Sequence, residues 1–105
     1  MPELTLSEVL HLVSMELATL DEIERQRFYR FAVPAFRVVY ECAGASGAGT
    51  SSAWVVAQLE SVVLAYDEDE DEFGIGTLQQ DGRLTHWGTY GERLSWSLRE
   101  FPSLR

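Results

Sequence analysis

The sequence predicts an α+β fold: a pair of N-terminal helices, an antiparallel β-sheet of three to five strands, and a C-terminal helix that packs on the sheet. Three observations predict it. Apolar residues recur at helical spacing near both ends of the chain. Runs rich in β-branched and aromatic residues fill the middle. The pair Asp81-Gly82 between two such runs is typical of a hairpin turn. The length of 105 residues suits a single domain over residues 1–105.

The first helix is predicted over residues 5–20. Thr5 is followed three residues later by Glu8, which is the pattern of a capping box at a helix N-terminus. One stripe of the helix is apolar, so we expect it to pack on the rest of the domain. The residues of that stripe are Leu6, Val9, Leu10, Val13, Leu17 and Leu20.

A second helix is predicted over residues 22–31 and a last one within residues 91–101. Asp21 is a suitable N-cap for the second helix, and Pro34 ends it because proline disfavours helix in the residue before it. The last helix has apolar residues at i, i+4 and i+7, which places them on one face. These residues are Leu94, Leu98 and Phe101.

Strands are predicted between these helices. Residues 35–42 alternate between apolar and polar, which indicates a strand, and the Gly- and Ser-rich residues 43–52 are expected to form a flexible loop. Residues 53–66 fit either a strand or a helix, and their paired valines favour the strand. Residues 73–90 predict the hairpin, in which Gly74 and Gly76 mark a bulge or a close approach of two backbones.

The charge is strongly acidic. There are 17 acidic residues against 8 basic ones, giving a net charge of -9, and every basic residue is an arginine. Proteins that bind nucleic acid or anionic membranes need positive charge, so this composition argues against both as direct partners. A basic protein is the favoured partner. Because the start of the chain lacks a basic segment before an apolar one, and no 18-residue apolar run exists, we expect neither a secretory signal nor a membrane span.

No motif for a cofactor, a metal or catalysis is complete. The loop at Gly44–Ser51 nearly matches a phosphate-binding loop, but Thr50 stands at the lysine position. A calcium loop starting at Asp67 would need Gly and Glu where the chain has Glu72 and Leu78. We therefore predict no cofactor, no metal site and no enzymatic activity. The single Cys42 excludes an internal disulfide and fits a cytoplasmic protein. Its alternation with apolar residues predicts a core position.

The remaining feature is the run "YDEDEDEF" at residues 66–73. Six adjacent carboxylates repel one another, and a plain turn needs only one or two charges. If the run is extended, it presents a row of anions that suits a basic surface. The open alternatives are a solvated turn and neutralisation by the chain's own arginines. The predicted partner-binding residues are Asp67, Glu68, Asp69, Glu70, Asp71, Glu72 and Trp87.

The predicted function is a small acidic inhibitor that blocks the nucleic-acid-binding surface of a basic, nucleic-acid-handling protein. Such nucleic-acid mimics include immunity proteins, antitoxins and phage anti-CRISPR proteins. One alternative is a non-catalytic adaptor or oligomerising module that binds through apolar surfaces, with a homodimer left open. A third possibility is a small enzyme that uses Cys42 and His86, or a pair of carboxylates, for catalysis. A zinc site lacks support, because no Cys or His residues have the spacing of metal ligands.

Overall fold

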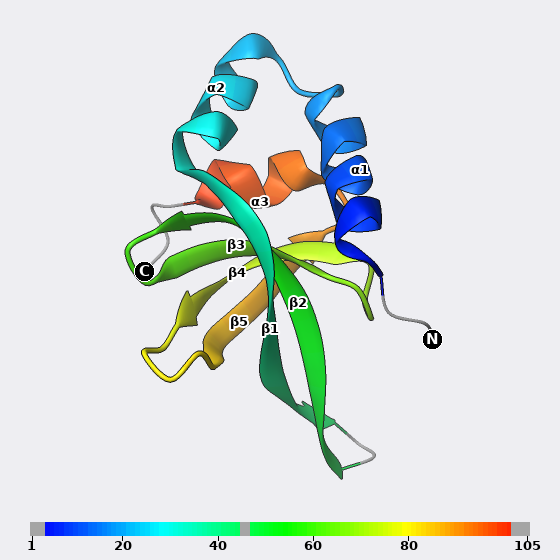
Figure 1. Ribbon diagram of the computed structural model, residues 1–105, viewed down its shortest axis with the longest axis vertical. Coiled ribbons are helices and arrows are strands. Elements are labelled where there is room, and N and C mark those ends of the chain that lie inside the picture. Colours follow the sequence, from blue (N-terminus) through cyan, green and yellow to red (C-terminus); the bar gives the residue numbers. More distant parts are fainter. Residues whose placement is uncertain (1–3, 45–46, 102–105) are drawn as a thin grey trace.

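The computed structural model describes residues 4–44 and 47–101, and it describes side chains there except for residues 41–50. Two helices come first, followed by five strands and a last helix (Figure 1). The strands form one antiparallel sheet in the order β1-β2-β3-β4-β5, so the α+β prediction is confirmed. The elements are α1 (Leu6–Leu17), α2 (Glu22–Phe31), β1 (Ala32–Gly44), β2 (Gly47–Leu59), β3 (Val62–Asp67), β4 (Glu72–Leu78), β5 (Leu84–Gly91) and α3 (Leu94–Glu100).

Both N-terminal helices begin at the predicted caps. The Thr5 side chain accepts the backbone N–H of Glu8, whose carboxylate accepts the N–H of Thr5. Asp21 and Glu24 make the same reciprocal pair at the start of α2. Each capping box satisfies donors that a helix end leaves without intrahelical partners. The boundaries of α2 are those that the sequence predicts.

Two predictions for the strands were incomplete. The expected flexible loop over residues 43–52 is mostly strand, because β1 continues to Gly44 and β2 begins at Gly47. The two connecting residues, 45 and 46, lie outside the described residues. Residues 53–66 are strand, as favoured, but they contain a hairpin that the sequence prediction missed. Glu60 adopts a φ of 55° in this turn between β2 and β3, although it is not a glycine.

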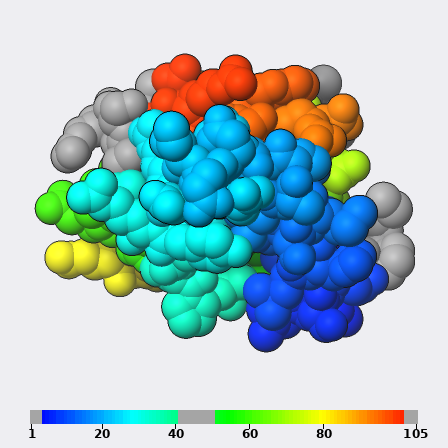
Figure 2. Space-filling view, turned by 90° about the horizontal axis from the view of Figure 1, so that it is seen from above, coloured from blue at the N-terminus to red at the C-terminus, as the bar shows by residue number. Residues whose placement is uncertain are grey.

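All three helices cover one face of the sheet. Figure 1 shows them gathered at the end of the molecule opposite the β1–β2 hairpin tip, and Figure 2 shows that together they form a continuous surface seen from above. Side chains from the helices and from that face share one core. Its buried residues are Val9, Val13, Leu20, Phe28, Val56, Ala57, Leu64, Tyr66, Phe73, Ile75, Leu94, Leu98 and Phe101.

The opposite face of the sheet is closed by curvature instead of by helices. The rings of Tyr40 on β1 and Trp87 on β5 lie 5.8 Å apart between centroids, so the two edge strands approach each other. The ring of Trp87 lies against Gly74 and Gly76, where a side chain would occupy its space. The ladder between β4 and β5 is irregular in this region, and His86 has a φ of 53°. The predicted bulge and close approach at the two glycines are confirmed.

The curvature of the sheet predicts that alanine substitutions at two glycines, Gly74 and Gly88, have very different effects on stability. A Cβ at Gly74 would lie 2.4 Å from the carbonyl oxygen of Gly88 and 2.8 Å from the Trp87 ring. A Cβ at Gly88 would meet no atom within 4 Å. We expect Gly74→Ala to lower the free energy of unfolding by about 1–3 kcal/mol or more. Gly88→Ala should leave it within about 1 kcal/mol of the parent. Urea denaturation followed by tryptophan fluorescence measures both, and equal losses would contradict this packing.

Candidate functional site

The acidic run forms the turn between β3 and β4. Asp67 is the last residue of β3 and pairs with Glu72, the first of β4. The four residues between them make the turn, and Asp71 takes a φ of 56° within it. The condition for an extended row of carboxylates is not met, because the chain reverses inside the run. The run forms a turn, which was one of the open alternatives. What the structure offers in its place is a turn whose six acidic side chains have different surroundings.

Asp67 is fully buried and organises the turn from inside. Its Oδ1 accepts the backbone N–H groups of Asp69 and Glu70, at 2.9 and 3.1 Å. Its Oδ2 accepts the hydroxyl of Tyr40. Burying a carboxylate without hydrogen-bond donors costs free energy of folding. These three hydrogen bonds offset that cost and allow an aspartate at this buried position. Because Asp67 has no exposed surface, it has no direct contact to offer a partner in this conformation.

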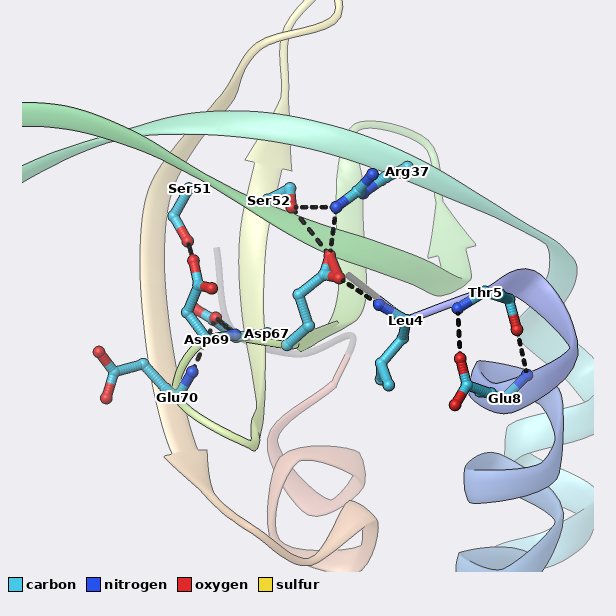
Figure 3. Close-up of polar contacts among 10 residues, drawn as sticks. Leu4, Thr5, Glu8, Arg37, Ser51, Ser52, Asp67, Asp69 and Glu70 are labelled. Atoms are coloured by element: carbon cyan, nitrogen blue, oxygen red, sulfur yellow. Dashed lines mark hydrogen bonds and ion pairs between the residues drawn. The ribbon is translucent and has the colours of Figure 1, made fainter. Parts of the chain in front are cut away.

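Glu68 is also turned inward, and its side chain is 5% exposed. Its Oε2 accepts the Arg37 guanidinium at 2.7 Å and the Ser52 hydroxyl at 2.9 Å. Its Oε1 accepts the backbone N–H of Leu4, just before α1, at 3.0 Å. Figure 3 shows these donors converging from three segments of the chain. Glu68 thus ties the start of α1 to β1 and β2, and the alternative of internal neutralisation by arginine applies to this one carboxylate.

Two of the exposed carboxylates accept hydroxyl groups. The Ser51 hydroxyl donates to Asp69, as Figure 3 shows, and the Tyr66 hydroxyl donates to Asp71. Burial, followed by the hydrogen bond to Asp71, raises the pKa of Tyr66 well above its usual range. Tyr66 therefore keeps its proton and remains a donor to Asp71 throughout the physiological pH range.

The outward-facing part of the turn consists of Asp69, Glu70 and Asp71, with Glu72 half-buried beside them. Gly91 pairs with Phe73, so Glu92 lies at the same end of the sheet, and it is exposed. We call these five acidic residues, Asp69–Glu72 and Glu92, the acidic end. The ring of Trp96 packs on Gly91, and this tryptophan is 45% exposed. An aromatic surface thus lies next to the carboxylates.

The other predicted residues have different surroundings. Trp87 is a packing residue of the curved face, half-buried against the two glycines. His86 is exposed, with Nδ1 3.2 Å from the Thr85 hydroxyl. The side chain of Cys42 lies outside the described residues, so neither its expected core position nor a pairing with His86 is tested. The described part of the chain contains no group of three or more His, Cys, Asp or Glu side chains arranged to hold a metal.

A groove of about 730 Å³ lies between β1 and the β4–β5 hairpin. Tyr40, Trp87 and His86 line it, but the Tyr40 hydroxyl is donated to Asp67. Asp81 and Arg83, which also line it, pair with each other at 2.8 Å. Tyr40, Asp81 and Arg83 thus already have polar partners, and the groove favours no particular reaction.

Sequence reasoning missed the donors that organise the turn. Tyr40 and Arg37 are 27 and 31 residues away from the carboxylates they contact. Only the register of β1 against β2, and of β2 against β3, brings them together. The one available signal was the isolated arginine in the middle of a strand, which needs a nearby anion when it is partly buried.

Among the helices of the described residues, none has the length and apolar composition needed to cross a membrane. No protein-family model, no curated protein and no solved structure matches this chain. The geometry of the turn and the charge of the chain are therefore the properties that bear on its function.

The inward position of Glu68 predicts a large stability difference within the run. Glu68→Ala removes the buried carboxylate that accepts hydrogen bonds from Arg37, Ser52 and the Leu4 N–H, and should cost about 2–3 kcal/mol of unfolding free energy. Glu70→Ala, which removes an exposed carboxylate, should change it by less than about 0.5 kcal/mol. Urea denaturation at neutral pH makes the comparison. If both variants are equally stable, Glu68 does not hold these segments together.

The raised pKa of Tyr66 predicts a loss of stability at alkaline pH. In the unfolded chain Tyr66 ionises near its ordinary value of 10.0, whereas in the folded protein it stays neutral to higher pH. Its contribution to stability is complete below pH 10 and falls as the pH rises above that value. Denaturation midpoints measured from pH 8 to 11.5 should therefore fall less steeply above pH 10 in Tyr66→Phe than in the parent. If the denaturation midpoints of the parent and of Tyr66→Phe fall in parallel above pH 10, this role of Tyr66 is refuted.

Proposed function

We propose that this chain is a non-catalytic acidic inhibitor that binds a basic protein and blocks its nucleic-acid-binding surface. The observation that carries the proposal is the fixed geometry of the acidic end. Asp67 accepts two backbone N–H groups of the turn from inside, and Asp69 and Asp71 each accept a hydroxyl. The carboxylates of Asp69 and Asp71 are thus held in place before any partner arrives.

Preorganisation matters because binding otherwise has to order the interacting groups. Each immobilised side chain costs about 0.5–1.5 kcal/mol on association. A turn that is already fixed avoids part of this cost, while its negative charge steers a basic partner towards it. The net charge of -9 adds to that steering over the whole molecule. These two properties together support binding to a cationic surface of the kind that holds phosphates.

Within this proposal the six residues of the run have two roles. Asp67 and Glu68 support the turn from inside, and the contacts are made by Asp69, Glu70, Asp71 and Glu72. Trp96 takes the role of aromatic anchor, because its ring is exposed next to the acidic end, whereas Trp87 packs on the curved face. Immunity proteins, antitoxins and phage anti-CRISPR proteins are the biological forms that such an inhibitor takes. We propose the cytoplasm as the compartment in which it works.

A second candidate function is an adaptor that binds through apolar contacts. One observation favours it: α1 exposes Leu6, Leu10 and Met15, whose exposed fractions are 46%, 51% and 60%. Binding through this surface would depend little on salt, because apolar burial is not screened by ions. Salt dependence therefore separates the two candidates.

The test is capture of partners from the native cytosol at low salt by the tagged protein, followed by elution with a salt gradient. We expect a basic nucleic-acid-binding protein to elute at moderate salt and to be displaced by added double-stranded DNA. The variant Asp69→Asn/Glu70→Gln should retain the fold and weaken binding of that protein by roughly tenfold or more, since close charge pairs are worth about 1.5 kcal/mol or more.

The matched control is Glu60→Gln/Asp81→Asn. It removes the same two charges from the turns at the opposite end of the sheet, where both residues are exposed. We expect this variant to bind like the parent. If the two variants lose affinity equally, net charge and not the acidic end is responsible. If binding survives high salt but is lost in Leu10→Asp, the adaptor function replaces the proposed one.

A further inference from the structure

The β1–β2 hairpin extends past the rest of the sheet. The last pair between β2 and β3 is Ala53 with Asp67, whereas β2 begins at Gly47. Along Gly47–Ser52 the pairs described for β2 are those with β1 alone. Figure 1 shows this ribbon leaving the sheet on the side away from the helices. The edge of β2 that β3 covers further along is thus without a strand partner here.

An unpaired strand edge is a template for another strand. In an antiparallel pair every second residue directs its N–H and C=O away from its partner, so part of the β2 backbone faces this edge. Natural proteins protect such edges with charged side chains, bulges or proline. The sequence of Gly47–Ser52, "GAGTSS", contains no charged, large or proline residue. By contrast, the ladder that joins the edge strand β5 to β4 shifts register twice.

The acidic turn lies at one end of this unpaired edge. Ser51 donates to Asp69, and Ser52 donates to Glu68, so the turn folds against β2 directly beyond the end of β3. Figure 3 shows both contacts. A strand added beside Gly47–Thr50 would lie in line with β3, about 4.8 Å from β2. One of its ends would meet the exposed carboxylates of Asp69 and Glu70.

We propose that β2 receives an extended, basic segment of the partner protein as an added strand at Gly47–Thr50, with cationic side chains against Asp69 and Glu70. This inference rests on the proposed function and adds the mode of binding to it. Four residues of strand span about 13 Å, which is long enough for a short segment to form its backbone hydrogen bonds. The backbone supplies affinity, and the acidic turn selects for positive charge.

The charge of the chain decides between a basic partner and a second copy. If two copies joined along this edge, each would carry a net charge of -9, and neither would add positive charge to neutralise the acidic turn of the other. Like charges directly opposed are destabilising, whereas a basic strand neutralises the turn as it pairs. The structure therefore favours a partner of opposite charge over self-association.

The test uses two synthetic octapeptides of equal charge. One alternates arginine and valine and is able to form a strand. The other alternates arginine and proline, which has no backbone N–H and cannot donate to a ladder. We titrate each into the ¹⁵N-labelled protein and record amide chemical shifts. The arginine–valine peptide should bind about tenfold more tightly and shift the amides of residues 47–52 as well as those of Asp69–Asp71.

The outcomes separate this inference from the proposed function. If both peptides bind equally and shift only the turn, strand addition is overturned and charge recognition by the acidic end stands. If neither peptide binds, strand addition is overturned, and the proposed function is then judged by capture of partners from the cytosol. If light scattering gives a dimer without peptide and the amides of residues 47–52 shift with protein concentration, a second copy occupies the edge and the inference fails.

Discussion

Two buried carboxylates, those of Asp67 and Glu68, are the constraint on which the arrangement of this chain depends. A buried carboxylate must receive hydrogen bonds or a counter-ion, because its desolvation costs several kcal/mol otherwise. Asp67 receives them from Tyr40 and from the turn itself, and Glu68 from Arg37, Ser52 and Leu4. These donors come from the start of α1, from β1 and from β2. The turn therefore ties the start of α1 to β1 and β2, and it adds side-chain contacts to the backbone hydrogen bonds that already pair these two strands.

The curvature of the sheet is coupled to this turn through Tyr40. Its hydroxyl is donated to Asp67, while its ring contacts Trp87. Trp87 in turn occupies the space left open by Gly74 and Gly76. The two glycines let the ring approach the sheet, and the ring positions Tyr40 over the buried carboxylate. Packing on the curved face and polar contacts at the turn are thus parts of one arrangement, so that disturbing either one affects the other.

Local patterns predicted the helices, the hairpin at Asp81-Gly82 and the α+β class, because caps, periodicity and turn residues act over a few positions. They failed where the outcome depends on distant pairing. The composition of the Gly- and Ser-rich residues 43–52 predicts a loop, but β1 and β2 pair with each other along this segment. The inward direction of Glu68 follows from Arg37, 31 residues earlier, and no local pattern records it. The sequence was sufficient to predict that the acidic run lies in a turn or at a strand end. It was not sufficient to predict which of the acidic side chains are buried and which are exposed.

The hydrogen bonds of the exposed carboxylates indicate whether these residues serve stability or recognition. Tyr66 is buried, and its hydroxyl needs an acceptor, so its bond to Asp71 has a sufficient explanation in stability. The bond from Ser51 to Asp69 is different. It lies at the surface, where a hydrogen bond replaces equally good ones with water and adds little to stability. Solubility would require the charge of Asp69 but not a fixed direction for its carboxylate. Recognition requires both, and for this reason Asp69, more than Asp71, supports the proposed assignment of this surface to a basic partner.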